Sequence, residues 1–323
     1  MNPTAVIQVK RGIGDVIWHL PFIRAIAAVS PGGKVTFLAP TSSHAKELLA
    51  AQPYIAETRY FEHTGSELTR IVHQFQLVRL LRQGHFRTIW ILDRTIRPAL
   101  AAMLASIPVR IGVGLTRQRL FITNSGIDQS HYYDHPIDWL RALMAAMHVP
   151  LSSTEPDLQV SAAAIAAIGE KFSACARPWI VLGIGASHPA RDWPDGHWVE
   201  FLTNLRQRTG GTIFLIGGSE NAARAQILIG HSAGATAINA CDLALREALA
   251  LLHHADLFVG TDSGPMNLAA AVATPTFGLF GVNRALSYSK YIHPITPPGG
   301  LSPDGMQQIS PAQVLERIAP HLS

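Results

Sequence analysis

The stretch "DLFVGTDSGPMNLAAAVATPTFGLFG", residues 256–281, decides the fold of the second half of the chain. It contains an apolar run, the polar loop "TDSG", an alanine-rich helical segment and a second apolar run. Strand, loop, helix and strand in this order form a unit whose strands lie parallel in a sheet covered by helices. The stretch therefore predicts an α/β domain with a polar loop at the carboxyl end of a strand.

The same alternation extends over both halves of the chain. In the first half we expect strands at 5–10, 34–39, 86–93 and 109–114, and helices at 14–29, 42–51, 67–84, 97–107 and 136–149. In the second half we expect strands near 179–183, 212–216, 236–240, 256–260 and 275–281, with helices between them and a closing helix at 310–322. This predicts two doubly wound, Rossmann-like domains facing a central cleft, joined by a polar, proline-containing connection between about 150 and 178.

Composition limits the class of protein. The chain has 323 residues, 48% hydrophobic and 15% charged, with no apolar run of the roughly 18 residues that a membrane span requires. The segment "MNPTAVIQVKRGIGD" lacks the pattern of a signal peptide, which predicts a cytoplasmic protein. Cys175 and Cys241 are too few for a disulfide framework or a zinc cluster. The net charge of +4 comes without a dense basic run, so we expect no nucleic acid partner and at most a weak attraction to anionic surfaces.

The first candidate loop, "KRGIGDVIWHLP", follows the first predicted strand. Gly12 and Gly14 suit a tight turn, and Asp15 stands at the start of the next helix. Asp15 is either a helix cap or a carboxylate that acts as a general base, and the loop alone leaves both open. Ile17 holds the third glycine position of a dinucleotide-binding motif, and no acidic residue ends the next strand, which disfavours a dehydrogenase.

Two loops of the second half could bind a phosphorylated ligand. In "GIGASHPARDWPDGHW", Ala186 is small, and Ser187 and Arg191 could bind phosphate oxygens. The alternative is that this sequence forms a capped helix with a solvated arginine. In "LIGGSENAARA", two glycines allow close approach of the backbone, and Glu220 could accept hydrogen bonds from a ribose. The alternative for the second loop is that Ser219 caps a helix.

The loop of the opening stretch predicts an anion site. Thr261, Asp262, Ser263 and Gly264 directly precede the helix, whose first N–H groups have no partner within the helix. We therefore expect a phosphate to bind here, with Asp262 holding the loop rather than the phosphate, because like charges repel. Asn267 lies one turn into the helix, where it either faces the ligand or packs locally.

No metal site is predicted. The motif "HYYDH" spaces His131 and His135 four residues apart, beside Asp134 and Asp138, but two such histidines alone are a weak metal signal.

Together, these loops resemble the glycosyltransferase family that contains the ADP-heptose:lipopolysaccharide heptosyltransferases, family nine. The segments "GIGDVIWHLPFIRAI", "WILDRTIRPALAAML", "RIGVG" and "LREALALLHHADLFVGTDSGPMNLAAAVATPTFGLFG" carry the resemblance, which extends over the whole chain. It implies a GT-B fold with an acceptor-binding domain over 1–155 and a nucleotide-sugar domain over 156–323. It also implies that the closing helix, about 310–323, packs back on the first domain.

The resemblance implies an inverting transferase that uses no metal or other cofactor, with Asp15 as the general base. Arg191 and the helix start after Asp262 would stabilise the leaving diphosphate, while Ser219 or Glu220 would hold the nucleoside. Gly14, Ala186, Ser187, Asn267 and the loop of residues 261–264 complete the implied donor site. The implied partners are an ADP-linked sugar, by default ADP-heptose, and a glycan or glycolipid acceptor such as the lipopolysaccharide core. A peripheral contact with the inner membrane is a further expectation.

Two residues depart from the family pattern. Arg191 stands where the characterised heptosyltransferases carry a lysine, and Asn267 stands where they carry a histidine. Arginine keeps the charge with a different geometry, and asparagine donates hydrogen bonds but carries no proton. The alternative hypothesis is therefore a catalytically weak nucleotide-sugar-binding protein on the same fold. Arginines of the first half could meet an acidic acceptor or be solvated surface charges; they are Arg94, Arg97, Arg117 and Arg119.

Overall fold

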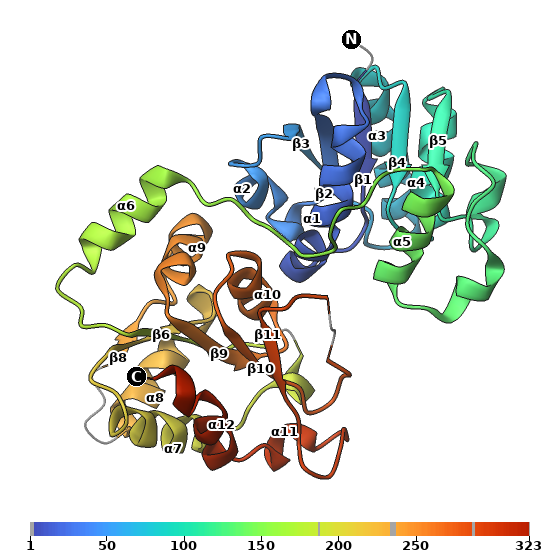
Figure 1. Cartoon of the computed structure of the whole chain (residues 1–323). Coiled ribbons are helices and arrows are strands. Elements are labelled where there is room, and N and C mark those ends of the chain that lie inside the picture. The colour runs from blue at the N-terminus through green and yellow to red at the C-terminus, as the bar shows by residue number, and fades with distance from the viewer. Residues whose placement is uncertain (1–2, 187, 233–236, 286–287, 323) are drawn as a thin grey trace. The chain divides into compact units, whose positions relative to one another are not determined.

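The fold is described from a computed structural model, in which residues 3–186, 188–232, 237–285 and 288–322 are placed well enough to describe. The chain divides into two compact units, which we call unit 1 (Met1–Pro156) and unit 2 (Asp157–Ser323) (Figure 1). None of the helices in the described part of the chain combines the length and apolarity needed to cross a membrane.

Unit 1 is built on a parallel sheet with the strand order β3-β2-β1-β4-β5. Its strands are β1 (Thr4–Ile7), β2 (Val35–Pro40), β3 (Ile55–Phe61), β4 (Thr88–Ile91) and β5 (Val109–Gly112). Its helices are α1 (Ile13–Ala28), α2 (Ala45–Leu49), α3 (Glu67–Gln83), α4 (Ile96–Leu104) and α5 (Pro136–Ala146). Helices α3 and α4 pack together over one face of the sheet, where Leu77, Leu81 and Ala99 join Ile7 and Ile89 in one buried cluster.

The strand order of unit 1 reverses beside its first strand. The chain runs outward from β1 to β2 and β3, and then returns to place β4 on the other side of β1. Helices that follow β1 and β4 thus leave the sheet in opposite directions, and this opens a crevice at the carboxyl ends of the two strands. The loops after β1 and β4 are therefore the natural place for a ligand in this unit.

Unit 2 is built on a second parallel sheet, with the order β11-β10-β9-β6-β7-β8. Its strands are β6 (Trp179–Gly183), β7 (Thr212–Ile216), β8 (Ala237–Asn239), β9 (Leu257–Thr261), β10 (Thr276–Leu279) and β11 (Ile292–Ile295). Its helices are α6 (Ala162–Lys171), α7 (Asp195–Arg206), α8 (Ala222–His231), α9 (Leu245–His254), α10 (Gly264–Ala271), α11 (Gly305–Gln308) and α12 (Pro311–Ile318). Here the order reverses between β6 and β9. The two parallel, helix-covered sheets confirm the predicted pair of doubly wound domains.

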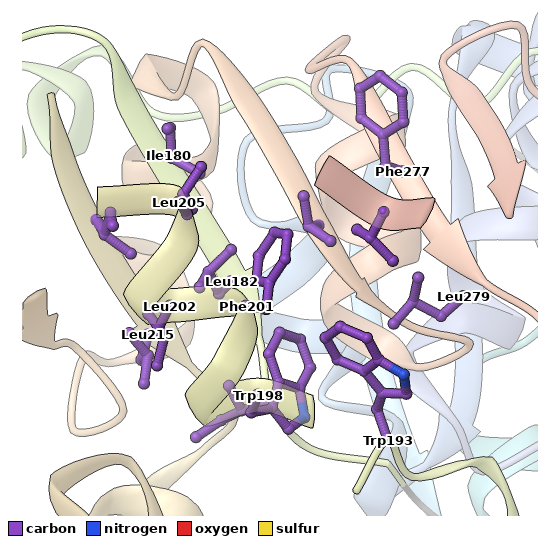
Figure 2. Packing of buried hydrophobic residues seen from close by; sticks show 14 of the residues in the cluster. Ile180, Leu182, Trp193, Trp198, Phe201, Leu202, Leu205, Leu215, Phe277 and Leu279 are labelled. Carbon is purple, nitrogen blue, oxygen red and sulfur yellow. The ribbon is translucent and has the colours of Figure 1, made fainter. Parts of the chain in front are cut away.

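Tryptophans anchor the core of unit 2. Trp193 and Trp198 are fully buried, with ring centroids 4.8 Å apart in an edge-on arrangement, and Phe201 packs beside both (Figure 2). The Trp193 indole also donates to the Ile309 carbonyl at 2.9 Å, which satisfies its buried N–H. This core fixes the end of the loop that follows β6.

The last helix packs within unit 2. Val314, Leu315 and Ile318 belong to the core of that unit, where α12 packs on α7, and the contact with the first domain that the resemblance implied stays a prediction. The apolar residues of α12 lie three and four apart, so the helix has one buried face, and α7 occupies it.

Four helices and strands in the described part of the chain were missing from the sequence prediction, and one of them is the short helix α11. The segment "AAAIAAIGEK", assigned to the connection, forms α6, because alanine-rich sequence favours a helix even beside a polar, proline-containing segment. Strand β3 lies at a sheet edge and lacks regular alternation of apolar residues. Strand β11, "IHPI", contains Pro294, which an edge strand tolerates.

Candidate functional site

The loop after β9 is tied to the loop after β6. Thr261, the last residue of β9, is fully buried, and its hydroxyl donates to the Gly185 carbonyl at 3.0 Å. The Ser263 hydroxyl donates back to the Thr261 carbonyl at 3.1 Å. Because β6 and β9 are neighbours at the reversal point, these bonds fix two loops in the crevice of unit 2.

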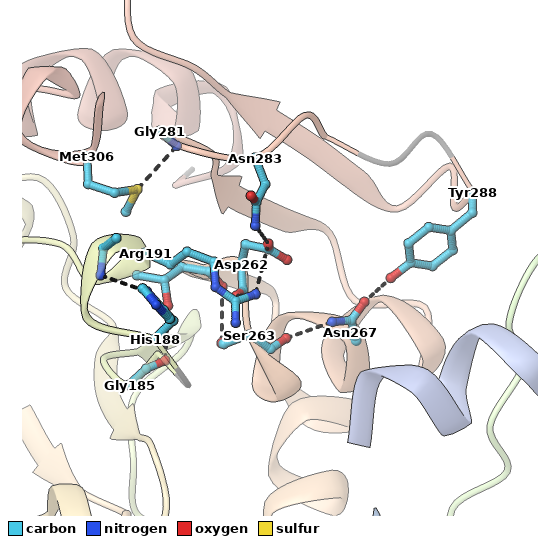
Figure 3. Close-up of polar contacts among 12 residues, drawn as sticks. Gly185, His188, Arg191, Asp262, Ser263, Asn267, Gly281, Asn283, Tyr288 and Met306 are labelled. Atoms are coloured by element: carbon cyan, nitrogen blue, oxygen red, sulfur yellow. Dashed lines mark hydrogen bonds and ion pairs between the residues drawn. The ribbon is translucent and has the colours of Figure 1, made fainter. Parts of the chain in front are cut away.

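Arg191 and Asp262 form a charged pair across these two loops (Figure 3). Arg191 Nη1 lies 3.3 Å from both the Asp262 carboxylate and the Asp262 carbonyl oxygen. The two side chains are only 27% and 18% exposed, so the pair is better sheltered than a typical surface ion pair. The Asn283 amide donates to the same carboxylate at 3.3 Å. The Asp262 carboxylate thus holds the Arg191 guanidinium and the Asn283 amide in place.

The helix after this loop begins without a side-chain cap. Ser263 occupies the cap position of α10, but its hydroxyl bonds to Thr261 instead of to the helix. Gly264 is the first residue of α10, and Pro265, which has no N–H, follows it. The positive end of the helix dipole therefore lies beside Arg191, an arrangement that favours an anion.

Asn267 is buried beneath the loop. It is 3% exposed, its amide donates to the Ser263 carbonyl at 2.7 Å, and its carbonyl accepts from the Tyr288 hydroxyl (Figure 3). These contacts match the local packing that was the alternative to ligand contact for Asn267, and its role in donor binding stays a prediction. Its contacts join the start of α10 to the segment that carries Tyr288.

The remaining predicted donor residues of unit 2 lie in loops after β6 and β7. Ala186 is half-buried, and Ser187 lies outside the described residues. Gly218 has a φ of +82°, a conformation that favours glycine. Ser219 and Glu220 follow on an exposed 3₁₀ turn, Ser219–Asn221, where no side-chain cap forms. The alternative interpretation, that Ser219 caps a helix, does not hold, and the Ser219 hydroxyl and the Glu220 carboxylate are accessible.

Sequence reasoning missed Arg224, on α8. Its guanidinium donates to the Ile184 carbonyl at 2.6 Å, to Asp192 at 2.7 Å and to Asp195 at 2.6 Å. One side chain thus holds both ends of the loop that carries Arg191. No local motif marks Arg224, because its partners lie about 30 to 40 residues away along the chain.

In unit 1, Asp15 lies in the first turn of α1, half-buried. Its carboxylate accepts from the Gly12 N–H at 3.1 Å. Burial raises the pKa of the Asp15 carboxyl, against the opposing effects of the Gly12 hydrogen bond and the Lys10 charge. Gly12 has an ordinary φ of −85°, so no tight turn requires glycine there. A side chain at Gly12 would instead place its Cβ 2.9 Å from the Asp15 carboxylate, and Gly14 lies within the helix.

One turn after Asp15, His19 is buried and neutral. Its ring is hydrogen-bonded to the Gln8 side chain and to the Asp15 main chain. Burial lowers the pKa of His19 to about 4, so the ring carries no charge near neutral pH. The sequence reasoning did not single out His19 or Gln8, although the spacing of four from Asp15 to His19 was visible.

Asp93, just after β4, lies on the other side of the same crevice. Its carboxylate accepts from the Thr95 N–H at 2.7 Å, the Thr95 hydroxyl and the Val9 N–H at 3.3 Å. Burial raises the pKa of Asp93, opposed by these bonds. Since Val9 follows β1, Asp93 joins the loops after β1 and β4 and is a structural carboxylate rather than an accessible one.

Beside these loops, unit 1 contains a cavity of about 550 Å³. Its lining includes basic and histidine side chains: Arg70, Arg94, Arg97, His63 and His73. Apolar side chains, among them Phe61 and Leu77, line it as well. Two of the four predicted acceptor arginines, Arg94 and Arg97, thus line one cavity, whereas Arg117 and Arg119 are not part of its lining.

The histidines of "HYYDH" have local partners. His131 pairs with Asp134 at 2.7 Å, and His135 accepts from the Ile137 N–H to cap α5. Among the residues that the structure describes, no three His, Cys, Asp or Glu side chains are arranged to hold a metal ion. Cys175 and Cys241 are free thiols.

Residues 74–297 match the model of glycosyltransferase family 9 (heptosyltransferase). The chain is 26% identical over 286 residues to lipopolysaccharide heptosyltransferase 2 of Salmonella typhimurium, an alignment that covers 83% of this chain and 80% of that protein. It is 22% identical over 287 residues to the lipopolysaccharide core heptosyltransferase OpsX of Haemophilus influenzae, covering 86% and 79%.

The fold also matches solved structures. Escherichia coli ADP-heptose lipopolysaccharide heptosyltransferase II superposes with a TM-score of 0.80 at 22% identity, covering 100% of this chain and 98% of the other. Escherichia coli heptosyltransferase WaaC, solved with ADP-2-deoxy-2-fluoro heptose, gives 0.73 at 18% identity, covering 98% and 99%. These similarities confirm the GT-B fold class that the sequence predicted.

Proposed function

Because the chain belongs to glycosyltransferase family 9, we propose that it transfers a heptose or related sugar from an ADP-linked donor to a lipopolysaccharide-core acceptor. The names of its relatives support the acceptor, and ADP-heptose in the names of similar structures supports the donor. The observation that carries the proposal is the pairing of Arg191 with the loop at the uncapped start of α10, at the reversal point of unit 2.

In this proposal, unit 2 binds the donor. The start of α10 and the Arg191 guanidinium hold the diphosphate and stabilise the charge that develops on it as it leaves. Ser219 and Glu220, accessible after β7, hold the nucleoside, and Glu220 accepts from ribose hydroxyls. Asp262 positions the Arg191 guanidinium by pairing with it, and Arg224 holds the loop that carries Arg191 by donating to the Ile184 carbonyl.

Unit 1 supplies the base and binds the acceptor. Asp15 takes the proton from an acceptor hydroxyl while that oxygen attacks the anomeric carbon, and the bond to the diphosphate breaks on the opposite side. A single displacement of this kind inverts the anomeric centre, and Arg191 with the helix dipole replaces a metal in this mechanism. The raised pKa of Asp15 suits a base, because a more basic carboxylate takes a proton more readily.

The acceptor occupies the cavity of unit 1. Its arginines, Arg70, Arg94 and Arg97, match an acceptor that carries carboxylate or phosphate groups, since guanidinium binds both in two-point fashion. A glycolipid acceptor would also bring the protein into peripheral contact with the cytoplasmic face of the inner membrane. That localisation is part of the same proposal.

Thermal stabilisation of the purified protein by ADP, ADP-heptose, other nucleotide sugars and NAD tests the donor assignment. We expect a selective shift with ADP and ADP-heptose that persists in Asp15→Ala, because Asp15 acts in chemistry and not in donor binding. A shift with another nucleotide alone would change the donor, and no shift or a shift only with NAD would reject the transferase. Binding without transfer by the wild type would favour the alternative, a nucleotide-sugar-binding protein in which Asn267 replaces a histidine.

A further inference from the structure

Helix α3 of unit 1 exposes a row of large apolar side chains. Leu68 is 77% exposed and Phe75 is 70% exposed, and Ile71 and Val72 between them are each more than half exposed. Their spacing of three, four and seven residues places all four on one stripe of the helix. Four contiguous apolar residues exposed on one stripe mark an interaction surface rather than ordinary surface variation.

This stripe is distinct from the face that packs into the core. Leu77, Val78 and Leu81 are the buried residues of α3, and they bind the helix to the sheet and to α4. Helix α3 is therefore apolar on two sides, and within the described residues of unit 1 only the side that carries Leu77, Val78 and Leu81 packs into the core. The exposed stripe does not contribute to holding the helix in place.

The same stripe becomes basic toward the end of the helix. Arg79 and Arg82 lie four and seven residues after Phe75 and are exposed, and the Arg82 guanidinium donates to the Leu104 carbonyl at 2.9 Å. Met103 and Leu104, at the end of α4, are 38% and 45% exposed, so they add apolar surface beside Arg82. Within α3 the acidic residue is Glu67, in the first turn, where the helix dipole favours it.

We infer that this stripe, with Arg79 and Arg82, docks unit 1 on an anionic lipid bilayer. A helix lying in the membrane interface combines apolar side chains that enter the acyl boundary with arginines that reach anionic headgroups. The combination on α3 fits that pattern. A second copy of the chain fits it less well, because a symmetric interface would bring the arginines of both copies together.

Docking through α3 would also orient the acceptor cavity. His73, Gln74 and Leu77, on the neighbouring side of the same helix, line the cavity, and Gln74 donates to the Arg97 carbonyl at 3.0 Å. A membrane-bound α3 would therefore hold the cavity at the lipid surface, where a lipid-anchored glycan is presented. This consequence rests on the proposed function, whereas the docking itself rests only on the surface of α3.

Sedimentation of the full-length protein with lipid vesicles tests the inference. We expect binding to vesicles of equal parts phosphatidylethanolamine and phosphatidylglycerol, weaker binding to pure phosphatidylcholine, and weaker binding at high salt. The double variant Leu68→Ser with Phe75→Ser should lose on the order of tenfold in partition coefficient. Arg79→Gln with Arg82→Gln should lose on the order of tenfold on the anionic vesicles.

Ile227→Ser is the matched control, because Ile227 is 55% exposed on α8 in unit 2. It should bind vesicles as the wild type does. Equal binding to neutral and anionic vesicles, or equal losses in the Ile227 and Phe75 variants, would overturn the inference. So would a dimer that the Phe75 variant dissociates without any change in lipid binding. The thermal shift with ADP is measured on the same variants, so a failure of donor binding is separable from a failure of docking.

Discussion

The two units have the same topology at their reversal points but opposite electrostatic character. At the crevice of unit 1, Asp15 and Asp93 accept hydrogen bonds from neutral donors, and burial raises the pKa of both. At the crevice of unit 2, Asp262 pairs with Arg191 beside the positive end of a helix. The first arrangement suits the transfer of a proton, whereas the second suits the binding of an anion. Doubly wound topology therefore decides where a site forms, and the residues that neighbour its carboxylates decide what the site can do.

Replacing Asp15 tests the proton-transfer side of this comparison and should have the largest effect. Asp15→Asn keeps an acceptor for the Gly12 N–H but cannot take a proton, so we expect kcat to fall by about 10²–10⁴-fold. The wild-type rate should decline on acidification, because the base must be ionised, with a midpoint above the ordinary aspartate value of about 3.9. Transfer of sugar from ADP-heptose, measured as ADP release over a pH series, gives both quantities.

Asp134→Asn is the matched control for this variant. Asp134 is an exposed carboxylate of the same unit, paired with His131. Its replacement should leave kcat and the pH profile unchanged. A similar loss in both variants, or full activity of Asp15→Asn, would show that Asp15 is not the base.

His19 tests whether the crevice of unit 1 is desolvated. Its pKa of about 4 in the folded protein lies below the ordinary value of 6.5, so the unfolded chain binds a proton more readily between these values. Stability should therefore be complete above pH 6.5 and fall on acidification toward pH 4, by up to about 3 kcal/mol. Urea unfolding over this pH range measures the free energy of unfolding.

His19→Gln should lack this share of the pH dependence. Since Asp93 is present in both proteins, the difference between the two curves isolates the contribution of the histidine. His148→Gln, at an exposed position of unit 1, controls for the loss of a histidine as such. Parallel curves for wild type and His19→Gln would mean that the crevice is hydrated.

The fold and the loops of this comparison were visible in the sequence because they depend on local patterns. Each apolar run followed by a polar loop and a helix predicted one βαβ step, and the carboxyl end of each strand then located Asp15, Arg191 and Asp262. Elements without a local pattern, such as the edge strand β11, were not predicted. The pattern of the closing helix predicted the helix itself, but it did not predict its packing on α7 in the core of unit 2.

Contacts between residues that are distant along the chain could not be predicted from the sequence. Arg224 holds the Arg191 loop from α8, and Tyr288 donates to Asn267 from 21 residues away. Neither pair has a spacing that repeats or a motif that marks it. Asn267 shows the limit most clearly, because its position one turn into a helix fits ligand contact and burial equally well. Only the fold reveals that its amide bonds to Ser263.

Replacing Arg191 tests the anion-binding side of the comparison. Arg191→Gln removes the positive charge beside the start of α10, and we expect the Kd for ADP to rise by about tenfold to a hundredfold. Arg191→Lys should lose less, because it keeps the charge and gives up only the planar geometry. Isothermal titration calorimetry with ADP measures the three affinities.

The control for Arg191 lies at the opposite edge of the same two strands. Arg177 precedes β6 and Asp256 precedes β9, and the two form an ion pair at 2.9 Å, just as Arg191 and Asp262 pair after these strands. Arg177→Gln therefore removes the same kind of pair from the amino ends of the strands, where Arg177 donates to the His254 carbonyl at the end of α9. Unchanged ADP affinity in Arg177→Gln, with a weakened Arg191→Gln, would assign the donor site to the carboxyl edge. Equal losses in both would mean that general charge governs nucleotide binding, and the contrast between the two crevices would then carry no information about where the donor binds.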